Sequence, residues 1–255
     1  MSSSRSEPPF RKSRAGAPPG FFAVEAAGLR WLAGARGAAV VEPLSVGEGE
    51  LLLPYVPQRP PATADAEEFG RALATTHRAG ARHHGCPPDG WTGDGFIATL
   101  PLPHAASAPA GWGQFYADLR LAPFAGALDR EGRRVVEAVC ERLRAGDEQV
   151  TGPAEPPSRL HGDLWSGNVI WGPDGAVLVD PAAHGGHRET DLAMLALFGL
   201  PHLDRVLAAY DEVHPLADGW RDRIALHQLH PLLVHAVLFG ADYPHRALEL
   251  ARRYR

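Results

Sequence analysis

Cysteine and lysine are both scarce in this chain of 255 residues. The two cysteines, Cys86 and Cys140, match neither a zinc site nor a redox motif in their spacing. No apolar run approaches the roughly 18 residues of a membrane-spanning helix, and residues 1–14 lack the apolar core of a signal peptide. We therefore expect a cytoplasmic protein with no membrane partner.

An excess of positive charge is also missing. The formal net charge is −5, and the arginines are spread among acidic residues without forming a basic stripe, so no nucleic-acid partner is expected. The 25 basic residues include a single lysine, Lys12. A general bias toward arginine explains the other positions, but it does not explain why position 12 retains an ammonium group.

The first part of the chain predicts a small lobe of strands and helix. A strand is expected at 9–13, and a helix follows Pro18 and Pro19, with apolar residues at helical spacing up to a stop at Gly34. The stretches "AAVVEPL" and "ELLLPYV" predict two strands joined by the turn "GEGE". A connector over 54–62 and a helix over 64–79 come next.

The second part predicts a larger, mainly helical lobe. Residues 80–110 indicate a loop, 111–145 two helices, and 146–158 a polar connection. A strand pair, "NVIW" and "AVLVD", precedes a helical region that begins at 189 and is interrupted near Pro201, Pro215, Pro231 and Pro244. The expected fold is α+β with two lobes, an N-terminal lobe over 1–56 and a C-terminal lobe over 57–255.

Three polar side chains stand at the open ends of that strand pair. The segment "HGDLWSGN" has the spacing H-x-D-x-x-x-x-N, with Asp163 and Asn168, and Asp180 ends the following strand. Phosphoryl transfer needs one carboxylate to accept a proton from the attacking hydroxyl, and an amide and a second carboxylate to hold metal ions against the phosphates. Each residue alone could merely cap a turn or a strand, but the joint pattern favours phosphoryl transfer.

The motifs "LHGDLWSGNVIW" and "VDPAAHGGHRETDLAMLALFG" resemble the fructosamine kinase (ketosamine-3-kinase) family, relatives of the aminoglycoside phosphotransferases with a protein-kinase-like fold. The likeness continues in "PPGFFAVEAAGLRWLA", "FGRALATTHRAG" and "WGQFYADLRLAP". It implies that Asp163 is the base that deprotonates O3 of an open-chain ketosamine, and that Asn168 and Asp180 carry Mg²⁺.

The same resemblance implies supporting roles for three neighbours of the catalytic loop. Asp191, at the start of a helix, would steady the loop through its backbone amides, although a simple helix N-terminal charge is also natural there. His161 would brace the loop by donating a hydrogen bond to backbone. Trp165 would line the sugar side of the cleft, or else pack between the lobes.

On the nucleotide side, Lys12 matches the family's phosphate-binding lysine and Glu25 matches the helix glutamate that fixes it. A compact, movable ammonium suits this position better than a planar guanidinium. In the connector "LLLPYVP", the carbonyl of Pro54 and the N–H of Val56 are expected to hold the adenine of ATP.

The sequence departs from the family in two places. Two strands and a glycine-containing turn precede the lysine strand in the family, whereas eleven residues precede Lys12 here, so a truncated sheet of about three strands is expected. Either the natural start lies upstream, or the protein is degenerate. In the substrate loop "GDGFIATLPLPHA", Gly95, Leu102 and His104 stand where the family has Asn, Gln and Asn.

The expected activity is therefore transfer of the ATP γ-phosphate to a fructosamine or ribulosamine, free or protein-bound, in protein deglycation by a monomer. A kinase for another amino sugar or aminoglycoside-like alcohol, and a non-catalytic nucleotide-binding protein, remain alternatives. A hydrolase with a metal at His161 and Asp163, and a zinc site at His227 and His230, are less favoured, since no further ligand completes either set at metal spacing.

Overall fold

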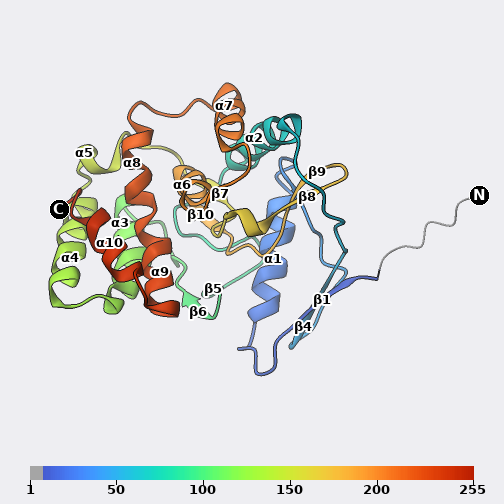
Figure 1. Cartoon of the computed structure of the whole chain (residues 1–255). Coiled ribbons are helices and arrows are strands. Elements are labelled where there is room, and N and C mark those ends of the chain that lie inside the picture. Colours follow the sequence, from blue (N-terminus) through green and yellow to red (C-terminus); the bar gives the residue numbers. More distant parts are fainter. Residues whose placement is uncertain (1–7) are drawn as a thin grey trace, which may run out of the picture.

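The computed structural model describes residues 8–255 (Figure 1). Strands β1 (Phe10–Ser13), β3 (Ser45–Val46) and β4 (Glu50–Leu53) form an antiparallel sheet in the order β1-β4-β3. Helix α1 (Phe21–Ala33) packs on this sheet through a shared core of Phe22, Ala26, Leu29, Val41, Leu51 and Leu53. The helix lies between Gly20 and Gly34, as its apolar spacing predicts.

The predicted pairing of "AAVVEPL" with "ELLLPYV" is wrong. Strand β2 (Ala39–Val40) pairs in parallel with β9 (Gly175–Leu178), whose other neighbour is β8 (Val169–Gly172). The partner of β4 across the "GEGE" turn is instead the short strand β3. Pro43 has no N–H to donate to a ladder, and it separates the two pieces. The front part of the chain therefore contributes a strand to the sheet that carries the β8–β9 hairpin.

Two long helices form one side of the C-terminal part. Helices α2 (Thr63–Arg78) and α7 (Leu203–Val213) lie side by side (Figure 1). A Cβ at Gly70 of α2 would lie 2.2 Å from the carbonyl oxygen of Val206, so the close approach of the helices requires glycine there.

Helix α6 (Glu189–Phe198) lies in the middle of the molecule beside β7 (Ser158–Leu160) and β10 (His184–Gly186), and the other remaining helices gather on the side away from β1 and β4 (Figure 1). They are α3 (Trp112–Tyr116), α4 (Arg130–Arg144), α5 (Glu148–Thr151), α8 (Trp220–His227), α9 (Leu229–Phe239) and α10 (Tyr243–Ala251). A π turn (Ala117–Leu121) and a 3₁₀ segment (Ala122–Ala127) connect α3 to α4, so the two predicted helices over 111–145 are present with an irregular link. The largest apolar core lies among α3, α4, α8, α9 and α10.

Several short strands escape the sequence prediction. The predicted loop over 80–110 contains a hairpin of β5 (Gly95–Ile97) and β6 (Leu100–Leu102). Strands β7 and β10 form a second pair beside the catalytic loop. The predicted interruptions near Pro231 and Pro244 are confirmed, since α8 ends at His227 and α9 at Phe239; each proline lies in the first turn of the next helix, where a missing N–H breaks no helical hydrogen bond. Within residues 8–255, no helix has both the length and the apolarity to cross a membrane.

Candidate active site

The catalytic loop runs from His161 to Asn168, between β7 and β8. Asp191 on α6 accepts hydrogen bonds from the backbone N–H groups of His161, at 2.8 Å, and of Gly162, at 3.0 Å. Burial opposes ionisation of Asp191, but hydrogen bonds from His77 and from the Gly162 amide lower the pKa of its carboxyl below its ordinary value. The His161 imidazole in turn donates from Nε2 to the Val179 carbonyl at 2.9 Å. The loop is thus fixed to α6 and to the end of β9.

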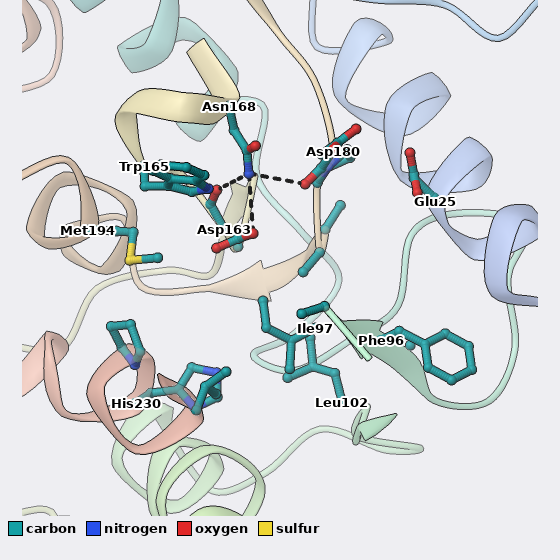
Figure 2. Close-up of a pocket in the computed structure, with 18 of the residues that line it drawn as sticks. Glu25, Phe96, Ile97, Leu102, Asp163, Trp165, Asn168, Asp180, Met194 and His230 are labelled. Atoms are coloured by element: carbon teal, nitrogen blue, oxygen red, sulfur yellow. Dashed lines mark hydrogen bonds between the residues drawn. The ribbon is translucent and has the colours of Figure 1, made fainter. Parts of the chain in front are cut away.

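Asn168 joins the two acidic residues singled out by the sequence (Figure 2). Its Nδ2 donates to the backbone carbonyl of Asp163 at 2.8 Å, to Asp163 Oδ2 at 3.2 Å and to the backbone carbonyl of Asp180 at 3.4 Å. Burial raises the pKa of Asp163 to about 6, against the opposing effect of the Asn168 hydrogen bond. A carboxyl group with such a pKa is well matched to proton transfer near neutral pH.

Asp180 is held in a strained backbone conformation. Its φ is 55°, in the left-handed region that non-glycine residues seldom adopt, and it precedes Pro181, which disfavours helical conformations. The Asp180 side chain is nevertheless 44% exposed, and its Oδ1 forms an ion pair with Lys12 Nζ at 3.0 Å. Strain of this kind is retained where the surroundings fix a side chain for function.

The single lysine of the chain lies in an ion-pair cluster between the two lobes. Lys12 on β1 donates to both carboxylate oxygens of Glu25 on α1, at 2.7 and 2.8 Å. Burial works against its charge, but the carboxylates of Glu25 and Asp180 outweigh that effect and raise the pKa of Lys12. The ammonium is therefore charged and is directed toward the acidic cluster.

These side chains converge on one cavity of about 540 Å³, a volume typical of small-molecule sites. Of the residues singled out by the sequence, the cavity is lined by Lys12, Glu25, Asp163, Trp165, Asn168, Asp180 and Asp191. His161 lies buried behind the loop. Pro54 and Val56 follow β4 and are not among the lining residues, so their contact with adenine stays a prediction.

The residues present fit a magnesium ion. The hydrogen bonds of the Asn168 side chain to other described residues all use Nδ2, which leaves Oδ1 available. The Asp180 carboxylate is half exposed on the same cavity. Mg²⁺ prefers a few such protein oxygen ligands together with phosphate oxygens.

A sequence model of the fructosamine kinase family matches residues 2–254. The chain belongs to the fructosamine kinase family. A probable ketoamine kinase of Thermus thermophilus is 34% identical over 233 residues, which cover 89% of this chain and 79% of that protein. The crystal structure of a Thermobifida fusca protein assigned as a fructosamine-3-kinase shares 48% identity with a TM-score of 0.86, and the match covers 96% of this chain and 84% of that one.

The fold extends beyond the fructosamine kinase family. A crystal structure of an aminoglycoside phosphotransferase has a TM-score of 0.58 at 18% identity, covering 99% of this chain and 92% of that chain. At this identity the likeness concerns the fold alone. The protein is thus a two-lobed α+β phosphotransferase of the protein-kinase-like class that acts on a hydroxyl group and uses ATP, as the sequence predicts.

The structure explains the altered substrate loop of this family member. Gly95 on β5 pairs with Leu102 on β6, and a Cβ at Gly95 would lie 2.9 Å from the His104 ring. The imidazole therefore fills the space that a side chain at position 95 would need. Two of the three departures in this loop, Gly95 and His104, thus form a single packing arrangement.

Sequence reasoning missed the far wall of the cavity. Phe198 of α6, His235 and Phe239 of α9, and Tyr243 of α10 line it beside Trp165 of the catalytic loop. His235 and Phe239 lie one helical turn apart in α9, a spacing that was a usable signal, whereas Tyr243 begins α10.

His227 and His230, whose pairing as a zinc site the sequence disfavours, face different partners. His230 Nδ1 donates to the Arg120 carbonyl, whereas His227 lies 3.3 Å from Glu189, beside His187. His187, Glu189 and His227 are close enough to hold a metal ion, but Arg223 already occupies both carboxylate oxygens of Glu189, at 2.6 and 2.9 Å. This buried cluster instead fastens α6 to α8.

Proposed function

We propose that this enzyme transfers the γ-phosphoryl group of ATP to O3 of a ketosamine, a fructosamine or ribulosamine that is free or attached to a protein. The observation that supports this most strongly is the convergence of Asp163, Asn168, Asp180 and Lys12 on one cavity. Family membership supports the same reaction.

In the proposed reaction, the Asp163 carboxylate accepts the proton of the O3 hydroxyl as O3 attacks the γ-phosphorus. The O3–P bond forms, the bond from the γ-phosphorus to the bridging oxygen breaks, and ADP leaves with that bonding pair. Asn168 Oδ1 and the Asp180 carboxylate would hold Mg²⁺, which when bound neutralises charge on the phosphate oxygens. Lys12, oriented by Glu25, would contact the α- and β-phosphates.

The remaining residues position these groups. Asp191 and His161 would keep the loop in the geometry that aims Asp163 at the sugar. Trp165 would cover the sugar from the side of α6, and the Pro54 carbonyl and Val56 N–H would bind adenine. The enzyme would work as a cytoplasmic monomer, and phosphorylation of the ketosamine would begin removal of the sugar from the amine.

The deciding experiment offers Mg·ATP with a fructosamine, free fructose and an aminoglycoside, and follows phosphate transfer by mass spectrometry and NMR. Phosphorylation at O3 of the fructosamine alone is expected. Asp163→Asn should lower kcat by about 10²–10⁴ while nucleotide binding survives, and Asp174→Asn, in the exposed turn between β8 and β9, is the matched control.

Transfer to the aminoglycoside alone would assign the enzyme to the amino-sugar class instead. No turnover with any acceptor, together with retained nucleotide binding, would favour a non-catalytic member. An Asp163→Asn variant of near-normal rate would remove Asp163 from its role as the base.

A further inference from the structure

Five rings form a continuous wall along the cavity. Trp165 and Phe198 are 6.1 Å apart between ring centroids, and Phe198 lies 5.0 Å from His235. His235 in turn lies 5.5 Å from Phe239 and 5.0 Å from Tyr243. All five line the cavity. We call this set the aromatic wall.

The aromatic wall runs from the reacting group to solvent. Trp165 is two residues from Asp163 and is 39% exposed, and Phe239 at the other end is 64% exposed. Large apolar side chains left open to water within a pocket generally mark a binding surface. A molecule that presents a hydroxyl to Asp163 can therefore extend along the wall toward the opening.

No carboxylate of α9 or α10, both of which the structure describes in full, lines this side of the cavity to form an ion pair with a cationic ligand. Among the described residues of α9 and α10 that line the cavity there is no Asp or Glu; they are His230, Pro231, Val234, His235, Leu238, Phe239 and Tyr243. Burial lowers the pKa of His230 to about 3 and lowers the pKa of His235, so both rings are neutral at ordinary pH. Asp242 is exposed outside the lining, and the Arg246 guanidinium lies 5.8 Å from the Tyr243 ring.

We propose that the aromatic wall binds the substituent on the ketosamine nitrogen and selects neutral, apolar or aromatic substituents over cationic ones. The inference rests on the proposed function. In a ketosamine the nitrogen is bonded to C1, and three bonds separate the nitrogen from C3. The substituent on the nitrogen therefore begins close to the reacting hydroxyl at C3. With O3 at Asp163, that substituent can reach Trp165 and Phe198 first and the outer rings next. The wall thus distinguishes ketosamines by the amine from which they derive.

The test compares three ketosamines of the same sugar, derived from benzylamine, glycine and 1,4-diaminobutane. The kcat/KM of the benzylamine derivative should exceed both others at least tenfold, which corresponds to about 1.4 kcal/mol. Phe239→Ala should lower that kcat/KM severalfold through KM, with kcat nearly unchanged, because the contact is made equally before and during reaction. Tyr243→Ala should act in the same direction.

Val237→Ala is the matched control, because Val237 is 44% exposed on the same helix and does not line the cavity. It should leave all three kcat/KM values unchanged. Equal kcat/KM values for the three derivatives, or a Phe239→Ala effect of the same size on all three, would overturn the inference and leave the proposed function intact. If none of the three is phosphorylated, the proposed function fails and the inference with it.

Discussion

Burial raises the pKa of Asp163, so the rate of the enzyme should depend on pH near neutrality. With a pKa of about 6, the carboxyl group is protonated below that pH and cannot accept the proton of a hydroxyl. We expect kcat/KM to fall about tenfold per pH unit below pH 6 and to level off above it, because kcat/KM reports groups of the free enzyme. Initial rates measured between pH 5 and 8 give the profile.

Two of the histidines that line the same cavity, His104 and His230, do not titrate in this pH range. Burial lowers the pKa of His104 to about 4 and that of His230 to about 3, so both stay neutral through the transition. A profile that remains level down to pH 5 would show that the base titrates elsewhere.

Gly167 determines where the Trp165 ring can lie. A Cβ at Gly167 would stand 2.3 Å from the indole Cη2. Gly167→Ala should therefore displace the ring and raise KM for the acceptor severalfold, while KM for ATP is little changed. Steady-state kinetics with each substrate varied in turn measure both constants. Gly126→Ala, where no atom lies within 4 Å of the added carbon, should change neither.

At the scale of elements, α6 connects the catalytic loop to the helical core. Its Asp191 holds the loop, and its Glu189 forms a buried ion pair with Arg223 on α8. Glu189→Gln would leave the Arg223 guanidinium buried without a charged partner, and we expect it to lower the free energy of unfolding by about 3–5 kcal/mol. Urea unfolding of both proteins measures the difference.

The matched control for that prediction is Glu131→Gln. Glu131 pairs with Arg252 at the surface, where both side chains are more than 40% exposed. Loss of such a pair should cost at most about 1 kcal/mol. Similar losses in the two variants would contradict the distinction between them.

Helices and turns that are specified by residues close together in the chain were predictable from the sequence. Strand pairs that depend on residues far apart in the chain were not. The apolar spacing and bounding glycines of α1, and the turn between β8 and β9, are contained in short stretches. The pairing of β2 with β9 joins segments more than 130 residues apart in the chain, and no local pattern records it. The segment containing β5 and β6 is rich in glycine and proline, which are typical of loops, so its composition gives no sign of a pair of three-residue strands.

The same contrast holds within the active site. The spacing of Asp163, Asn168 and Asp180 follows from one loop and one hairpin, so the sequence brought them together correctly. The aromatic wall draws its rings from the catalytic loop, α6, α9 and α10, and depends on helix packing. Only the i, i+4 spacing of His235 and Phe239 could be seen in the sequence.

For the whole molecule, nucleotide binding should couple folding of the two parts of the chain. Lys12 comes from β1 and Asp180 follows β9, so a ligand that contacts both stabilises the folded state. At a hundredfold excess over Kd the stabilisation is about 2.7 kcal/mol, or a rise in Tm of roughly 5–10 °C for a chain of this length. Thermal scans with and without Mg·ATP measure it.

Lys12→Ala should abolish most of the rise in Tm caused by Mg·ATP, and Asp163→Asn should preserve it. Arg11→Ala, which removes the neighbouring exposed cation, is the matched control and should also preserve the rise. An undiminished rise in Lys12→Ala would mean that the ammonium does not contact the nucleotide.

The solitary ε-amino group also makes the chain an unusual target for covalent labelling. Apart from the α-amine, an acylating reagent such as a succinimidyl ester finds one primary amine, and it lies in the ion pair with Glu25. Slower acylation of Lys12 when nucleotide is bound, measured by peptide mass spectrometry, would therefore report occupancy of the active site. Sugars form ketosamines with amines, so this chain offers a single side chain, Lys12, to that reaction. The Lys12 side chain is only 25% exposed, which shields it in part.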